Sequence, residues 1–80
     1  MPVVFREGGF EFHFYSNEGN PREPLHIHVR RGRDRAKVWL TPSVALARSS
    51  GLSARDLTTV LATVRRRREE TERAWNEYFG

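Results

Sequence analysis

The sequence predicts an α+β domain, in which an antiparallel sheet of four or five strands is covered on its apolar face by a long C-terminal helix. Two observations support this fold class. Apolar and polar residues alternate with a period of two in the first half of the chain, which is typical of strands. An apolar stripe with helical spacing follows residue 54. The 80 residues form one domain, 1–80, with a small core.

Residues 3–15 alternate around a central Gly-Gly pair, which indicates a first hairpin with a two-residue turn. This turn pairs Phe5 with Phe12 and Val4 with His13. Phe5 and Phe12 then share the apolar face. The opposite face of this hairpin carries Glu11, His13 and Tyr15.

Residues 25–40 form a second hairpin around the turn RGRD, and pairing Arg30 with Arg35 sets its register. The pairs on the apolar face are Val29 with Ala36, Ile27 with Val38, and Leu25 with Leu40. The pairs on the polar face are His28 with Lys37 and His26 with Trp39. A slip of one residue would place the aliphatic side chains opposite charged or aromatic ones, so the pattern specifies the register strongly.

The remaining segments complete the predicted fold. Residues 16–24 are polar and contain two prolines, which indicates a loop. The short segment 43–48 is interpreted as a strand, with a helical turn as the alternative. Ser53 and Asp56 have the spacing of a capping box, so a helix over 54–79 is expected. Such a helix would be about 39 Å long, whereas the domain should be about 30 Å across. The helix must therefore bend, overhang the domain, or pack against a second chain in a homodimer.

Strand alternation directs His26 and His28 to the same side of the sheet, with Arg30 beyond them and away from the core. Lys37 and Trp39 join this side from the neighbouring strand. If the two hairpins share one sheet, His13 and Tyr15 lie there as well. All three histidines are then expected on one exposed surface, which we call the histidine face.

Three interpretations of the histidine face remain open. It is the ordinary solvated side of an antiparallel sheet, although Tyr15 and Trp39 are large rings for such a surface. Alternatively, it binds RNA, with rings stacking on bases and cations holding phosphates. The candidate nucleic-acid-binding residues are His13, Tyr15, Arg30 and Trp39. A third interpretation is a metal site, in which His13 or Glu11 would complete the His-x-His pair.

RNA binding could extend to metal-independent cleavage. Cleavage through the 2′-hydroxyl needs a base, an acid, and a cation beside the phosphorane, and histidines can transfer both protons. The candidate catalytic residues are His26, His28 and Lys37. This interpretation requires no cofactor and no metal.

Composition restricts the remaining function classes. The chain has no cysteine, which excludes disulfides and thiolate chemistry and fits a reducing cytoplasm. It has neither a leader pattern nor an apolar run of about 20 residues, so we expect no membrane association. Fourteen basic and ten acidic residues give a net charge of +4, which favours a polyanion or an acidic protein partner. The run RRRREE over 65–70 is either a solvated helix face or a nucleic-acid backbone contact.

The sequence also resembles a family of small bacterial proteins, the domain of unknown function 4160. The stretches that carry the resemblance are MPVVFREGGFEFHFYSNE, PLHIHV, AKVWL, GLS and AWNEYF. The resemblance implies a toxin-like component of a two-gene module, with a cognate antitoxin-like protein as partner. The alternative function is a non-enzymatic interaction domain. In that case the partner would dock on the histidine face or on Trp75, Tyr78 and Phe79.

Overall fold

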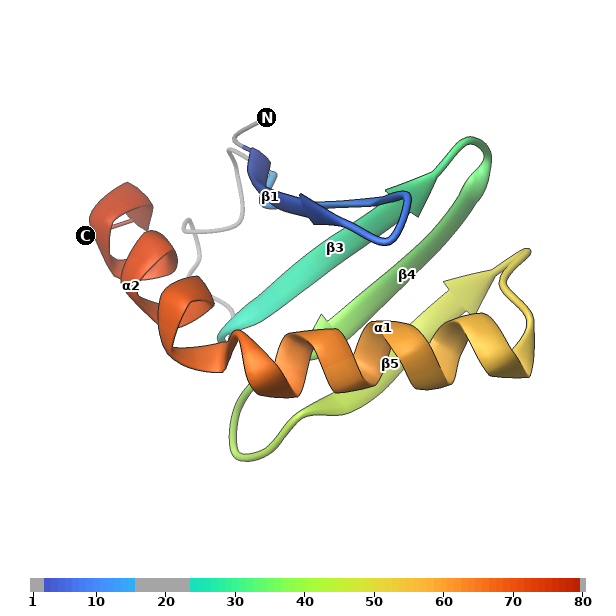
Figure 1. The fold of residues 1–80 in the computed structure, drawn as a ribbon. Helices are drawn as coiled ribbons and strands as arrows, with labels where there is room; N and C mark the ends of the chain where they lie inside the picture. Colours follow the sequence, from blue (N-terminus) through green and yellow to red (C-terminus); the bar gives the residue numbers. More distant parts are fainter. Residues whose placement is uncertain (1–2, 16–23, 80) are drawn as a thin grey trace.

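The computed structural model describes residues 3–15 and 24–79, which form one five-stranded antiparallel sheet and two helices. The strands lie in chain order, and Figure 1 shows α1 crossing one face of the sheet. The elements are β1 Val3–Glu7, β2 Phe10–His13, β3 His26–Arg31, β4 Asp34–Trp39, β5 Ala45–Ser50, α1 Ala54–Arg66 and α2 Arg68–Phe79. The α+β prediction is confirmed, and the segment predicted over 43–48 is a strand that begins and ends two residues later. The loop predicted over 16–24 lies almost wholly outside the described residues.

The register of β3 and β4 is the one that the alternation predicts. His28 lies opposite Lys37, Ile27 opposite Val38, and the ladder runs from His26 to Arg31 on β3. The Leu40 amide donates to the Leu25 carbonyl at 2.9 Å, which extends the pairing to the ends of both strands. This ladder therefore fixes which side chains face α1 and which face away from it.

The register of β1 and β2 departs from the prediction at one point. Phe5 pairs with Phe12 as expected, but an irregularity between Val3 and Phe5 places Val3 opposite His13. The predicted pairing of Val4 with His13 is therefore wrong. A bulge adds one residue to one strand, and the alternation of side chains does not reveal it.

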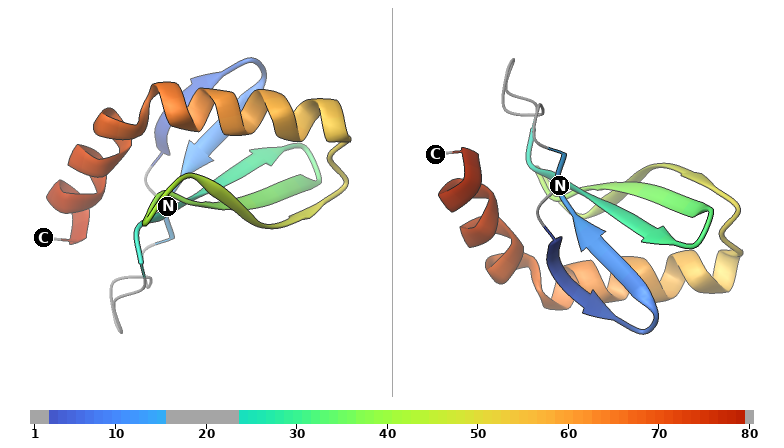
Figure 2. Two further views of the ribbon diagram at one scale, coloured as in Figure 1. Left: turned by 90° about the horizontal axis from the view of Figure 1, so that it is seen from below. Right: turned by 90° about the horizontal axis from the view of Figure 1, so that it is seen from above.

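The core lies between the sheet and α1. Phe5 and Phe12 stack with ring centroids 4.4 Å apart, and Ile27 is fully buried among them. The described core residues are Phe5, Phe10, Phe12, Phe14, Leu25, Ile27, Val29, Ala36, Val38, Leu40, Val60, Val64 and Trp75. Figure 2 shows α1 along one side of the sheet, whereas α2 turns away at its end.

The first turn of α1 is fixed by two sets of polar contacts around Asp56. The capping box predicted for Ser53 and Asp56 is present in both directions. The Arg31 guanidinium, at the end of β3, donates to both oxygens of Asp56 at 2.7 and 3.3 Å. These hydrogen bonds hold the pKa of Asp56 below its ordinary value. The start of α1 is therefore tied to the end of the central strand.

The helix expected over 54–79 is two helices, and the chain changes direction at Arg67, which is the first of the three expected alternatives. The molecule is 33 Å along its longest axis, which a straight helix of about 39 Å would exceed. The break therefore keeps α2 against the domain. Neither α1 nor α2 is long and apolar enough to cross a membrane.

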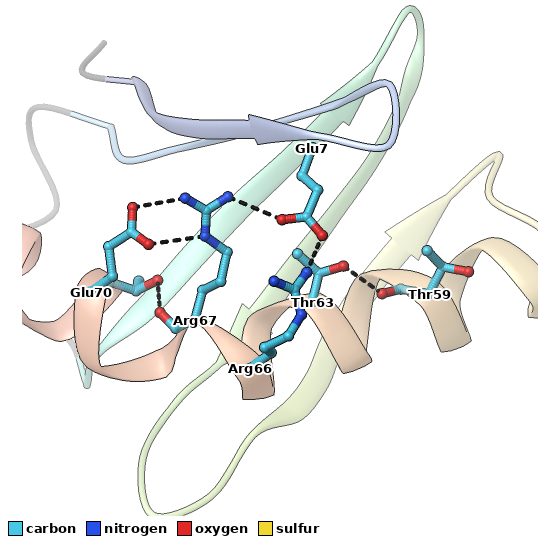
Figure 3. A network of polar contacts seen from close by, with 7 residues as sticks. Glu7, Thr59, Thr63, Arg66, Arg67 and Glu70 are labelled. Carbon is cyan, nitrogen blue, oxygen red and sulfur yellow. Dashed lines mark hydrogen bonds and ion pairs between the residues drawn. The ribbon is translucent and has the colours of Figure 1, made fainter.

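Arg67 connects three elements at this break. Its guanidinium donates to both oxygens of Glu70 at 2.9 Å and to Glu7 of β1 at 3.1 Å. It also lies 3.7 Å above the centre of the Phe5 ring. Arg66 pairs with the second oxygen of Glu7, as Figure 3 shows. Arg67 of the RRRREE run is therefore bound within the domain, and the interpretation of the run as a solvated or nucleic-acid-facing surface is wrong for it. Arg66 is 60% exposed, which agrees with the interpretation of a solvated helix face.

We expect the substitution Arg67→Gln to lower the midpoint of thermal unfolding. The change removes ion pairs to β1 and α2 and the cation–π contact with Phe5. The substitution Arg65→Gln is the matched control, because it removes the same charge from an exposed position two residues away. Circular dichroism should show a decrease for Arg67→Gln several times that of the control. Equal decreases would mean that Arg67 does not hold the two helices together.

Candidate anion-binding site

Four titratable side chains form a row across the sheet on the face opposite α1. His13 of β2 pairs with His28 of β3, His28 pairs with Lys37 of β4, and Lys37 pairs with Arg48 of β5. Directly paired residues of neighbouring strands point to the same face. The meander therefore collects one cationic or protonatable group from each of four strands.

The three histidines lie together, in a cluster of aromatic rings. The His13 and His28 rings stack at 5.8 Å, and the His26 and His28 rings meet edge to face at 5.1 Å. Tyr15 packs on His28 at 4.3 Å, and Trp39 packs on His26 at 5.5 Å. The histidine face therefore brings together all three imidazoles and both of the rings predicted to accompany them.

The predicted exposure of this face is wrong for the imidazoles. His13, His26 and His28 are 1%, 0% and 6% exposed. His26 lies 5.1 Å from Trp75 of α2, which reaches it from beyond the end of the sheet. Strand alternation predicts which side a residue faces, but it contains no information about which rings cover that side.

The tautomer of His26 follows from one hydrogen bond. Its Nδ1 lies 2.8 Å from the Pro24 carbonyl oxygen, which can only accept, so Nδ1 carries the proton and donates. His26 is thus held in place by the backbone just before β3. Because this imidazole is also fully buried, it cannot meet a ligand without a rearrangement of its neighbours.

His13 is a buried imidazole whose two ring nitrogens have no hydrogen-bond partner. Its Nδ1 is 3.6 Å from Glu11 Oε2, which is an electrostatic contact beyond hydrogen-bonding distance. Burial lowers the pKa of His13 below its ordinary value of 6.5, and the nearby His28 and Arg30 lower it further, whereas Glu11 opposes them. His13 is therefore neutral at pH 7 in the folded protein.

A pocket of about 210 Å³ opens beside this cluster, over β3, β4 and β5. None of the lining residues that the structure describes is acidic. The polar ones are Tyr15, His28, Arg35, Lys37, Arg48, Ser49 and Ser50. We call this cavity the basic pocket. Three cations and three hydroxyl groups around one cavity favour an anion, and an anion with several acceptor oxygens most of all.

The carboxylates near the basic pocket are engaged elsewhere. Glu11 accepts from Arg30 at 2.7 Å and from Arg6 at 3.3 Å. Among residues 3–15 and 24–79, no carboxylate pairs with Arg35 or Arg48. Lys37 is nearly buried, with its Nζ 4.5 Å above the Trp39 ring. The charges of Arg35 and Arg48 are therefore not neutralised by any carboxylate in the described part of the chain.

The other predicted site residues divide between the surface and the core. Arg30 lies on the predicted face, but Glu11 occupies its guanidinium. Trp75 is only 4% exposed and packs on Phe14 and Phe79, so it belongs to the core and cannot be a free docking residue. Tyr78 is exposed, as a docking residue must be, and Phe79 is half-buried.

Sequence reasoning missed Arg35 and Arg48 as pocket residues. Arg48 lies opposite Lys37 because β5 pairs with β4. The sequence contained a signal for Arg48. If residues 45–50 form a strand, the Arg48 side chain must lie on one of the two faces of the sheet, and one of these faces carries the histidines. The register shift between Lys37 and Val38 places Leu46, not Ala47, opposite Val38, and this shift could not be predicted.

The fold and the pocket define a small α+β protein with a cationic cavity on the open face of its sheet. A family model described as a domain of unknown function, DUF4160, matches residues 9–76, and the chain belongs to this family. No curated protein and no solved structure matches the chain. In residues 3–15 and 24–79, no group of three histidine, aspartate or glutamate side chains is placed to hold a metal ion.

The lowered pKa of His13 predicts a specific pH dependence of stability. A histidine that is harder to protonate when folded stabilises the protein above pH 6.5, and this contribution is lost as the pH falls from 6.5 towards the folded pKa. The substitution His13→Phe removes the titration but keeps a ring against His28. Between pH 7.5 and pH 5, the wild type should lose stability relative to the variant, by at most about 1.4 kcal/mol per pH unit for one proton.

Urea unfolding at several pH values measures this difference. A difference between the two proteins that stays constant from pH 7.5 to pH 5 would contradict the lowered pKa of His13.

Proposed function

We propose that the protein binds RNA and holds a backbone phosphate in the basic pocket. The supporting observation is that Arg35, Lys37 and Arg48 line one cavity together, with no carboxylate among the lining residues that the structure describes. Phosphate is the anion that matches this set, because several oxygens can accept from the two guanidinium groups and the ammonium at once. The hydroxyl groups of Ser49 and Ser50 supply further donors.

The size of the pocket and its aromatic wall favour a single strand over a duplex. A cavity of about 210 Å³ is smaller than the roughly 300–1,000 Å³ of drug-sized sites, so it suits one phosphate with its sugar. Tyr15, which is half-buried, offers a ring at the wall on which a neighbouring base can stack. A flexible single strand can place a phosphate inside while its bases turn towards such a ring.

A toxin-like role in a two-gene module belongs to the same proposal. It rests on the family resemblance, together with the RNA ligand that the basic pocket favours. A protein that sequesters or cleaves RNA would slow growth when it is expressed without its antitoxin-like partner. Induced expression in a bacterial host should reduce the growth rate, whereas the variant Lys37→Gln at equal abundance should not. Equal growth with wild type and empty vector would remove this role.

RNA binding should weaken steeply with salt, because each neutralised phosphate releases counterions. For three pocket cations on a single strand, log K should fall with log salt concentration with a slope of about −2. The substitution Arg48→Gln should reduce that slope by about 0.7. Fluorescence anisotropy with a labelled single-stranded oligoribonucleotide measures both values.

The matched control for this measurement is Arg65→Gln, which removes one exposed charge from α1 on the opposite side of the sheet. It should leave the slope within error of the wild type. Affinity that is independent of salt, or an equal effect of the two substitutions, would show that the basic pocket does not hold the phosphate.

Cleavage of the bound RNA is a second candidate function, and one observation favours it. His28 and Lys37 lie opposite each other in the ladder and both line the basic pocket. His28 would take the 2′-hydroxyl proton, the 2′ oxygen would attack phosphorus, and Lys37 would stabilise the phosphorane. The 5′ oxygen then leaves with a proton from solvent, giving a 2′,3′-cyclic phosphate and a 5′-hydroxyl. His26 does not line the pocket, so it has no direct part in this step.

The cleavage step predicts a large effect of His28→Gln on RNA hydrolysis in the presence of a chelator. Removing a general base should lower the rate by at least about 100-fold, while anisotropy still detects RNA binding. Gel analysis of the products should show cyclic phosphate ends. If the wild type releases no such product, the protein binds RNA without cleaving it; if the chelator stops the reaction, the metal-independent mechanism is wrong.

A further inference from the structure

Strand β5 is an open edge of the sheet. It pairs with β4 on one side and forms one end of the strand order. Five of its six residues are exposed, and Ala47 is half-buried. Leu46 is 37% exposed and is one of only three large apolar side chains in the described residues that are open to solvent. An edge of this kind offers backbone donors and acceptors to a further strand, with an apolar side chain to cover.

The basic pocket continues up to this edge. Arg48, Ser49 and Ser50 of β5 line it, and Arg48 lies opposite Lys37. A strand added beside β5 would lie about 4.8 Å away, with alternate side chains on the pocket side. The side chain opposite Arg48 would therefore reach the cations of the pocket.

We propose that β5 receives an extended acidic segment of a partner protein as a sixth strand. Backbone hydrogen bonds to β5 would supply general affinity, and alternate carboxylates of the segment would enter the basic pocket. The side chains between the carboxylates would lie on the side of Leu46 and cover it. This interaction goes beyond RNA binding and does not depend on it, although both ligands would use Arg48.

Charge favours an acidic segment over a second copy of this chain. Antiparallel pairing of two β5 strands would bring two basic pockets and two Arg48 side chains together. Like charges placed opposite each other across strands destabilise the pairing. The register shift in β5 places Arg48 opposite Lys37 and Leu46 opposite Val38, so these two side chains lie on opposite faces although they are two residues apart. A segment that carries acidic residues on one face and apolar residues on the other therefore meets both.

The experiment uses the full chain and a synthetic peptide of alternating glutamate and valine. Two control peptides separate the contributions: one has glutamine in place of glutamate, and the other has every amide N-methylated. NMR titration should show the largest amide shifts within residues 45–50. Binding should weaken at least tenfold for either control peptide, and at least tenfold for the variant Arg48→Gln. The variant Arg65→Gln should bind like the wild type.

Three results would overturn the proposal: no shifts within 45–50, equal binding of the N-methylated peptide, or shifts that follow protein concentration without peptide. The second would mean attraction by charge alone, and the third a second copy on the edge. RNA affinity measured on the same variants keeps the two proposals apart. Peptide binding without RNA binding removes only the RNA function, and the reverse result removes only the sixth strand.

Discussion

The central strand β3 is covered on both of its faces, and the rest of the structure depends on this double burial. Ile27 and Val29 enter the core on the side of α1, whereas His26 and His28 lie among aromatic rings on the other side. His26 has its hydrogen bond to the Pro24 carbonyl, whereas the two ring nitrogens of His13 are buried without a hydrogen-bond partner. The imidazoles are therefore packing elements first, and only His28 also borders an open cavity.

Trp75 of α2 helps to bury the face of β3 that carries the histidines, and α2 begins after the break at Arg67. The break allows Trp75 to meet both Phe14, at the end of β2, and His26, at the start of β3. Glu7 pairs with Phe10 on the apolar side of the hairpin, and its carboxylate contacts Arg66 and Arg67 at the break. A carboxylate that interrupts the apolar pattern is thus the link between the first hairpin and the two helices.

Local periodicity predicted the parts of the fold that depend on neighbouring residues. The β3–β4 register and the capping box of α1 follow from spacing alone, because a slip would bury charge or expose aliphatic side chains. The bulge near Val3 and the cover over His26 could not be predicted in this way. The first is an insertion that leaves the alternation intact, and the second depends on Trp75, nearly fifty residues away. The three histidines thus share one face of the sheet, as the alternation predicts, but the predicted exposure of their rings is wrong.

The distribution of charge explains why the open part of this face lies at β4 and β5. Acidic residues around the rest of the sheet form ion pairs: Glu7 with Arg67, Glu11 with Arg30, and Asp56 with Arg31. Arg35 and Arg48 have no such partner in the described part of the chain, although the net charge is only +4. The fields of Arg35 and Arg48 therefore add to one another at the basic pocket. Such a field acts over about one Debye length, roughly 8 Å at physiological ionic strength, so any anion that it attracts must dock within reach of β5.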